Sequence, residues 1–149
     1  MLPHRMNSEP ALTQAIVFSD MVIREHGTGK NTLIGCFGAY NLPKFPIQVP
    51  SFFATVLVTN LTADVSEISL TARVENPHNG LVLASTAAKV AFGRPPTRDD
   101  VTEVSVPIYK LGFPAAGLYK VVILVNNEKI GERNLPVNDI RATIQPSSQ

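Results

Sequence analysis

Hydrophobic and polar residues alternate along most of this chain, which is the pattern of β-strands with one buried and one wet face. The alternation is clearest in two stretches whose apolar residues recur at every second position: Ile68, Leu70, Ala72 and Val74 in the first, and Val104, Val106 and Ile108 in the second. Pro107 interrupts the second stretch and cannot donate a ladder hydrogen bond. We therefore expect that strand to lie at a sheet edge or to be bulged.

Twelve prolines and nine glycines divide the chain at short intervals, and no long helical period survives between them. Between these breaks lie eight extended runs, at residues 14–25, 31–40, 52–62, 67–75, 81–92, 101–111, 118–125 and 129–137. Strands at this spacing, joined by turn residues, predict an antiparallel sandwich. We expect an all-β, immunoglobulin-like antiparallel β-sandwich of about eight strands over residues 14–137, with loosely ordered tails at 1–13 and 138–149.

The segment 114–131 points to the immunoglobulin-like type of sandwich in particular. It contains a Gly-x-Tyr step at Gly117 and Tyr119, an apolar strand, and a two-residue turn at Asn126-Asn127. Asn tolerates positive φ, so this pair suits a tight hairpin. Tyr119 stands two positions before Val121, where immunoglobulin domains carry their second Cys. This spacing predicts a tyrosine corner, in which the phenol binds upstream backbone, so the role of Tyr119 and Gly117 is structural.

Two of the predicted strands are apolar on both faces and therefore need cover on both sides. In one, Val122 and Leu124 stand opposite the core-facing positions; in the other, residues of both parities are apolar. The cover is the N-terminal segment, a loop or a second subunit. We expect a homodimer through an outer sheet face, with five candidate interface residues: Val122, Leu124, Phe52, Val56 and Val58.

Composition and charge exclude several classes of protein. The net charge is +1 and no cluster of Lys and Arg appears, which argues against a nucleic-acid or anionic membrane surface. No apolar run approaches the length of a membrane span. The single Cys36 excludes an intramolecular disulfide and favours a reducing compartment. The N-terminus lacks the apolar core of a signal peptide. We expect a cytoplasmic protein of bacterial type.

The glycine-rich segment 27–32 invites comparison with a phosphate-binding loop. That motif needs a glycine where Arg24 stands and a Ser or Thr where Asn31 stands, and its loop must open a helix. The residues that follow are typical of a strand instead. The segment is therefore predicted to be a hairpin turn between the first two strands, and we expect no cofactor.

Asp20 is the unusual residue of the first run. It shares strand parity with three apolar residues that we expect to be buried: Ile16, Phe18 and Val22. A buried carboxylate needs partners. One interpretation makes Asp20 a catalytic or metal-binding carboxylate with His26 nearby. The other has it accept backbone hydrogen bonds at a bulge, or pair with Lys30 across the hairpin. We favour the structural interpretation.

The remaining candidates have plainer explanations. Cys36 lies in an apolar, glycine-flanked strand, which predicts a small buried core residue rather than a nucleophile. His4, His26 and His78 are isolated and show no metal-ligand spacing. Asp99, Asp100 and Glu103 offer oxygens for calcium, but Arg94 and Arg98 beside them offset the charge. We expect a solvated loop there and no metal.

Two blocks resemble a known family. The first runs from Ala15 through Asp20 and a Gly-Lys turn to the strand Leu33-Ile34-Gly35-Cys36-Phe37, followed by a Phe45-Pro46 corner. The second is the closing Gly117-x-Tyr119 hairpin. Together they are similar to an uncharacterised bacterial family of unknown function, and the resemblance implies a small immunoglobulin-like sandwich with no assigned catalytic or binding residue.

From these observations we expect a non-catalytic protein–protein interaction or accessory module, whose protein partner the sequence does not identify. The alternative is a small ligand-binding protein or enzyme with a pocket near Asp20, His26 and Lys30. A cleft lined by these three side chains would distinguish the alternative from the module.

Overall fold

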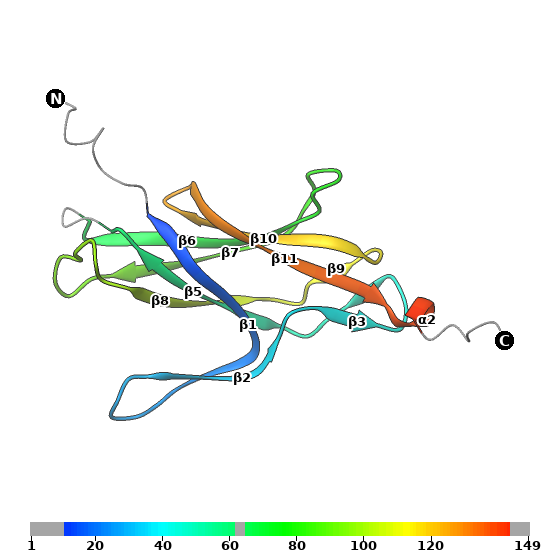
Figure 1. Ribbon diagram of the computed structural model, residues 1–149, viewed down its shortest axis with the longest axis horizontal. Coiled ribbons are helices and arrows are strands. Elements are labelled where there is room, and N and C mark those ends of the chain that lie inside the picture. Colours follow the sequence, from blue (N-terminus) through cyan, green and yellow to red (C-terminus); the bar gives the residue numbers. More distant parts are fainter. Residues whose placement is uncertain (1–10, 62–64, 144–149) are drawn as a thin grey trace.

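Within residues 11–61 and 65–143, which the computed structural model describes, the chain forms eleven β-strands and one helical turn. Two sheets face each other as the layers of a sandwich (Figure 1). The first sheet has the order β2-β1-β5-β8. Its strands are β1 (Leu12–Arg24), β2 (Asn31–Phe37), β5 (Phe52–Thr59) and β8 (Thr102–Ile108). All its pairings are antiparallel, and β8 lies at an edge, as Pro107 predicted.

The second sheet has the order β3-β11-β10-β6-β7. Its strands are β3 (Tyr40–Leu42), β6 (Glu67–Glu75), β7 (Val82–Ala91), β10 (Gly117–Val125) and β11 (Glu128–Asp139). β3 runs parallel to β11, and the other pairings are antiparallel. Two short strands, β4 (Ile47–Gln48) and β9 (Gly112–Phe113), form a separate pair, and α2 (Ile140–Thr143) follows β11.

The predicted fold class is confirmed: the chain is an all-β, immunoglobulin-like sandwich. The number of strands was underestimated, because the predicted run 31–40 is divided. β2 ends at Phe37, and the chain then crosses to the second sheet as β3, while β4 and β9 lie in segments without strand periodicity. Parts of the predicted tails belong to the fold, since β1 begins at Leu12 and β11 ends at Asp139. The rest of those tails, 1–10 and 144–149, lies outside the described residues.

The core between the sheets is aromatic at one end. Phe18, Phe52 and Phe113 are fully buried. The Tyr40 ring lies between two of them, with its centroid 5.8 Å from that of Phe52 and 5.6 Å from that of Phe113. Neighbouring rings are tilted or edge-to-face, the geometry that the quadrupoles of aromatic rings prefer. Tyr119 closes the cluster, 5.0 Å from the ring of Phe113. The cluster joins strands of both sheets, so it fixes how they pack.

The five candidate interface residues are all buried within this chain, so the choice of these residues for an outer interface is wrong, while the homodimer itself stays a prediction. Phe52, Val56 and Val58 face the core of the sandwich and have no exposed surface. The outward side chains of β5 are instead those of the opposite parity, such as Phe53 and Leu57, which are half-buried.

Val122 and Leu124 do stand on the outer face of β10, but they are only 3% and 8% exposed. On that face, Arg73 of β6 and Glu132 of β11 flank Val122, and Lys129 flanks Leu124. Long charged side chains can lay their aliphatic stems over apolar neighbours. Val122 and Leu124 are therefore already covered within one chain, and their burial requires no second subunit.

Candidate functional site

The most distinctive element is a hairpin formed by the second half of β1 and by β2. β1 pairs with β5 from Leu12 to Ser19 but with β2 from Phe18 to Arg24. The strand thus leaves the sandwich near Ser19, and the hairpin projects from the body at the lower left of Figure 1. We call residues 20–34 of this element the projecting hairpin.

The tip of the projecting hairpin is closed by hydrogen bonds around Glu25. The Glu25 amide donates to the carbonyl of Lys30 at 2.7 Å, and the hydroxyls of Thr28 and Thr32 donate to the Glu25 carboxylate at 3.2 and 2.9 Å. On the body side, the Asn31 side-chain amide donates to the Glu103 carboxylate of β8. These bonds hold the hairpin as a defined element although most of it lies outside the core.

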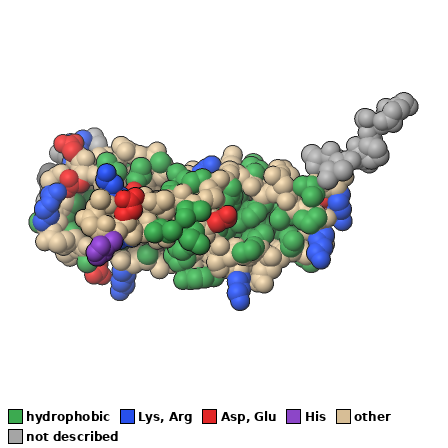
Figure 2. Space-filling model, turned by 90° about the horizontal axis from the view of Figure 1, so that it is seen from below, with side chains coloured by type: hydrophobic (Ala, Val, Ile, Leu, Met, Phe, Trp, Pro, Cys, Tyr) green, Lys and Arg blue, Asp and Glu red, His purple; other side chains and the backbone are tan. Residues whose placement is uncertain are grey.

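One face of the projecting hairpin is apolar and exposed. Met21, Ile23 and Ile34 are 50%, 44% and 43% exposed. Met21 pairs with Ile34, and Ile23 pairs with Thr32, so all four side chains point to the same side. The opposite face carries Val22 and Leu33, which pair with each other and are half-buried. Viewed from the side on which the hairpin projects, hydrophobic side chains gather along the middle of the molecule (Figure 2).

The sequence analysis did not identify Met21, Ile23 and Ile34 as candidate contact residues, although the apolar pattern of the first run indicates an exposed face. The first predicted run is apolar on both faces, because Met21 and Ile23 have the parity opposite to Phe18 and Val22. The rule that a strand apolar on both faces needs cover marks Met21 and Ile23 as surface in need of a partner.

The glycine-rich segment of the tip is a hairpin turn, as predicted. Gly27 and Gly29 have φ values of 92° and 70°, a backbone region that favours glycine. The chain continues from Lys30 directly into β2. A phosphate-binding loop requires a helix at this point, so the segment lacks that architecture.

Asp20 is exposed, which corrects the expectation that it is buried. Parity failed because β1 has already left the sandwich at this position. The carboxylate lies over Gly35 of β2, whose φ is 70°, and a Cβ on that glycine would stand 2.4 Å from Asp20 Oδ2. Only glycine therefore fits at position 35. Burial is the main cause that raises the pKa of the Tyr40 phenol, and the charge of Asp20 raises it further.

Asp20, His26 and Lys30 are not brought together in a pocket. Asp20 is at the base of the projecting hairpin, whereas the other two are exposed at its tip. The four residue-to-residue steps from Asp20 to Arg24 in the strand alone span about 13 Å. Asp20 and Lys30 form no ion pair with each other or with another described residue. The structure therefore gives the alternative of a pocket near these residues no geometric support.

Cys36 is exposed, so the expectation of a buried core residue is wrong. It lies on β2 opposite Ser19, where the hairpin has begun to leave the sandwich. His78 is exposed in the β6–β7 turn, and His4 lies outside the described residues. Within residues 11–61 and 65–143, no three His, Cys, Asp or Glu side chains are arranged to hold a metal ion.

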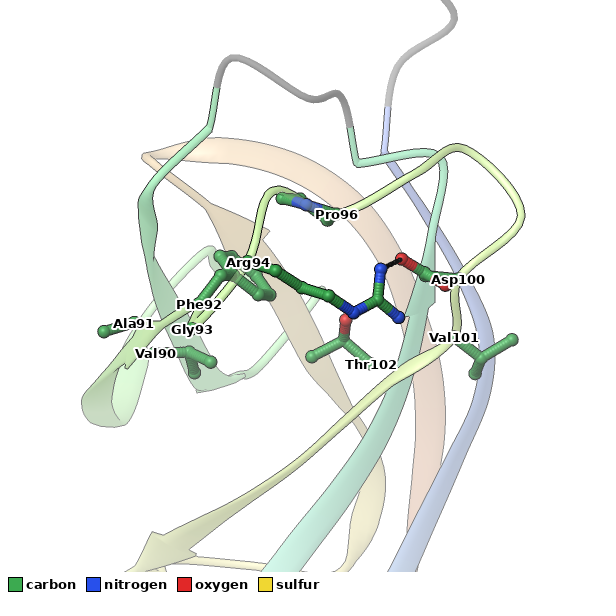
Figure 3. Close-up of a pocket in the computed structure, with 9 residues that line it drawn as sticks. All are labelled: Val90, Ala91, Phe92, Gly93, Arg94, Pro96, Asp100, Val101 and Thr102. Carbon is green, nitrogen blue, oxygen red and sulfur yellow. Dashed lines mark ion pairs between the residues drawn. The ribbon is translucent and has the colours of Figure 1, made fainter.

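The acidic loop borders an open cavity of about 620 Å³ between the ends of β7 and β8 (Figure 3). Phe92 and Pro96 line it, and the Arg94 side chain extends across it toward Asp100, with 3.7 Å between Nη1 and Oδ2. The Thr97 amide donates to Asp100 at 2.8 Å and is the main cause that lowers the pKa of that carboxyl; Arg94 lowers it further.

The two charges that face this cavity offset each other, so its chemistry suits a neutral or apolar group. Glu103 is engaged elsewhere, by Asn31, and Asp99 is exposed. The predicted acidic residues therefore do not converge on one point.

In the described part of the chain, no helix has both the length and the apolar composition to cross a membrane.

The sheet order, the corner at Tyr119 and the projecting hairpin define a small immunoglobulin-like sandwich with an exposed hairpin arm. The Tyr119 hydroxyl donates to the Ala115 carbonyl at 2.7 Å, which is the bond expected of a tyrosine corner. Within this class, the chain belongs to the family of unknown function DUF6941, whose family model matches residues 14–138. A comparison with curated proteins finds no match.

Several solved structures are similar to this chain at low identity. One is an immunoglobulin-like protein (PA1606) from Pseudomonas aeruginosa, with 10% identity, a TM-score of 0.36, and coverage of 88% of this chain and 98% of that protein. Another is a β-glucuronidase from glycoside hydrolase family 2, with 17% identity and a TM-score of 0.41. That match covers 68% of this chain, which spans only 12% of the glucuronidase. At these scores, the activity named for the glucuronidase belongs to that protein alone.

Proposed function

We propose that this protein is a non-catalytic protein-binding module and that the projecting hairpin is its contact element. The observation that carries the proposal is that β2, an edge strand, and the part of β1 that pairs with it together present three large apolar side chains that are about half exposed: Met21, Ile23 and Ile34. An exposed strand edge can accept a strand from a partner, whose main chain supplies hydrogen bonds and whose side chains extend the apolar face.

The expected gain in free energy is modest but sufficient for binding. Full burial of a Met or Ile side chain stabilises by roughly 1.5–3 kcal/mol. Met21, Ile23 and Ile34 are each about half buried already, so covering them completely contributes about 2–4 kcal/mol together. Hydrogen bonds to the edge of β2 add to this gain. The module is therefore suited to a partner that presents an extended, apolar segment.

Photo-crosslinking in cells that express the protein tests the proposal. A benzophenone amino acid is placed at Ile34 or Ile23 of the hairpin, and at Val82 as a control. Val82 is a matched position, since it is apolar, 45% exposed and lies on the edge strand of the other sheet. We expect discrete adducts of defined mass from both hairpin positions and none from Val82.

Absence of adducts from the hairpin positions would refute the proposal, and so would adducts of equal yield from Val82. The first result would mean that the hairpin does not meet a partner. The second would mean that capture reflects exposure alone rather than a specific surface.

A further inference from the structure

We propose that the cavity between the ends of β7 and β8 binds a small neutral molecule that carries a primary carboxamide on an apolar group. Its volume of about 620 Å³ lies within the range of small-molecule sites. No residue of the projecting hairpin lines the cavity, so this inference and the proposed function are tested separately.

The loop that closes the cavity is held in place by its own hydrogen bonds. The Thr97 amide donates to the Asp100 carboxylate at 2.8 Å, and the Asp100 amide donates to the Thr97 carbonyl at 3.0 Å. The Asn60 amide, at the end of β5, donates to the Arg98 carbonyl at 3.2 Å. Pro96 is buried. Because the walls are ordered without a ligand, binding costs little further ordering of the loop.

One side of the cavity is apolar. Phe92 and Pro96 line it, the first half-buried and the second buried. Val90 also lines it and lies on the inward face of β7, since it pairs with the core residue Ile68. These side chains provide a surface for the apolar group of a ligand.

Arg94 and Asp100 supply the polar side of the cavity and face each other across it (Figure 3). Nη1 and Oδ2 are 3.7 Å apart, which is an ion pair but too long for a hydrogen bond. The two side chains are 75% and 34% exposed, so a ligand can reach both. Thr97 and, to a lesser extent, Arg94 lower the pKa of Asp100, so its carboxylate is an acceptor at neutral pH. The cavity therefore presents a donor and an acceptor side by side.

A primary carboxamide matches this pair. Its oxygen accepts and its nitrogen donates, and standard bond lengths set the two atoms about 2.3 Å apart. With hydrogen bonds of about 2.9 Å, one carboxamide reaches both Arg94 and Asp100. A carboxylate ligand would instead face the like charge of Asp100, and an amidinium that of Arg94. A trans peptide bond points its N–H and C=O in opposite directions, so it meets only one of the two groups.

Nuclear magnetic resonance titration of the isotope-labelled full chain with benzamide, benzoate and benzamidine tests the inference. The three compounds share one ring and differ in charge and hydrogen bonding. We expect benzamide to shift backbone amide signals of residues 90–102 with a dissociation constant of about 1–10 mM, as befits so small a ligand. Benzoate, benzamidine and the secondary amide N-methylbenzamide should each bind at least about fivefold more weakly.

Two substitutions should change which compound the cavity prefers. Asp100→Asn keeps a carbonyl for the Thr97 amide but leaves the Arg94 charge unopposed, so benzoate should bind about fivefold more tightly than benzamide. Arg94→Met leaves the Asp100 charge unopposed, so benzamidine should be preferred by a similar factor. Lys89→Met is the control, because Lys89 pairs with Ser69 on the outer face of β7 and should leave the preference unchanged. Thermal unfolding checks that each variant is folded.

Three results would overturn the inference: no benzamide shifts up to about 50 mM, equal binding of all three compounds, or an unchanged preference in both cavity variants. A further titration uses N-acetylglutamine N-methylamide, which carries the same carboxamide on a peptide side chain. We expect it to bind more weakly than benzamide, because it presents no ring to Phe92 and Pro96. If it binds more tightly, the ligand is a protein side chain and the assignment to a small molecule is overturned.

Discussion

At the residue scale, Tyr119 shows how one hydroxyl can secure a connection to the core. Its ring is 2% exposed and packs against Phe113, while the hydroxyl reaches the Ala115 carbonyl in the loop before β10. The side chain thus combines burial of an aromatic ring with a hydrogen bond that fixes the path of the loop. Both contributions depend on one residue.

We predict that Tyr119→Phe lowers the free energy of unfolding by about 1 kcal/mol, the usual net value of one intramolecular hydrogen bond. The ring packing is retained, so the change isolates the bond. Urea unfolding measures it. Tyr109→Phe is the matched control, since Tyr109 is 63% exposed and should change stability by less than about 0.5 kcal/mol. Equal effects of the two substitutions would contradict the role of the corner.

At the element scale, β1 and β11 meet where the two sheets close at one side. A Cβ on Gly131 of β11 would lie 2.0 Å from Oγ1 and 3.0 Å from Cβ of Thr13 in β1. Nearby, Arg133 Nη1 donates to the Ile16 carbonyl at 2.6 Å, and its guanidinium lies 4.6 Å from the centre of the Phe18 ring. The close approach of these two strands therefore requires glycine at position 131.

We predict that Gly131→Ala destabilises the protein by about 1–3 kcal/mol, because the added methyl group overpacks the join. Thr13→Gly should recover much of this loss, because it removes the side chain that the new methyl group meets. In a double-mutant cycle by denaturant unfolding, the double variant should therefore lose less stability than the sum of the two single changes. Gly112→Ala is the control, since a Cβ there meets no atom within 4 Å. Simple additivity of the Gly131 and Thr13 changes would show that the two residues do not clash.

β10 shows, at the same scale, that a sequence pattern can predict burial of a strand without identifying the residues that cover it. Its apolar residues of both parities correctly indicated that the strand is buried on both faces. The pattern did not identify the cover, because the neighbours across the sheet are far apart in sequence. Only the register with β6 and β11 places Arg73, Glu132 and Lys129 beside Val122 and Leu124.

At the scale of the whole molecule, two phenols link stability to pH: Tyr119, which is buried, and Tyr40, which is partly buried. Burial raises the pKa of both Tyr40 and Tyr119 above the ordinary value of 10.0. At Tyr119 the bond to Ala115 acts in the opposite direction but does not outweigh burial. The unfolded chain therefore ionises its tyrosines at a lower pH than the folded protein does. The stability that these groups contribute is fully present below about pH 10 and is lost as pH rises above it.

We predict that the free energy of unfolding falls between about pH 8 and about pH 11, and that Tyr40→Phe reduces this fall. Phenylalanine keeps the ring among its aromatic neighbours but has no proton to lose. Urea unfolding at the two pH values measures the effect. Parallel pH dependence of the unchanged protein and the variant would show that Tyr40 does not contribute to this linkage.

The candidate site was less predictable than the fold. Strand periodicity and turn residues correctly placed most strands of the two main sheets, and Pro107 correctly placed β8 at an edge. Asp20 and Cys36 were assigned to the interior because their strands are apolar, yet both are exposed. Strand parity tells which residues share a face, but it does not tell where a strand leaves the body of the protein.

The sequence by itself determined the class of fold, because alternation, turn chemistry and the spacing of Gly117 and Tyr119 are local properties of the chain. Tertiary structure decided which apolar face stays uncovered, because that depends on where β1 exchanges β5 for β2 as its neighbour and on which long side chains lie over β10. These are contacts between distant segments, and no local pattern records them. The exposed face of the projecting hairpin, and with it the proposed function, follows from these distant contacts.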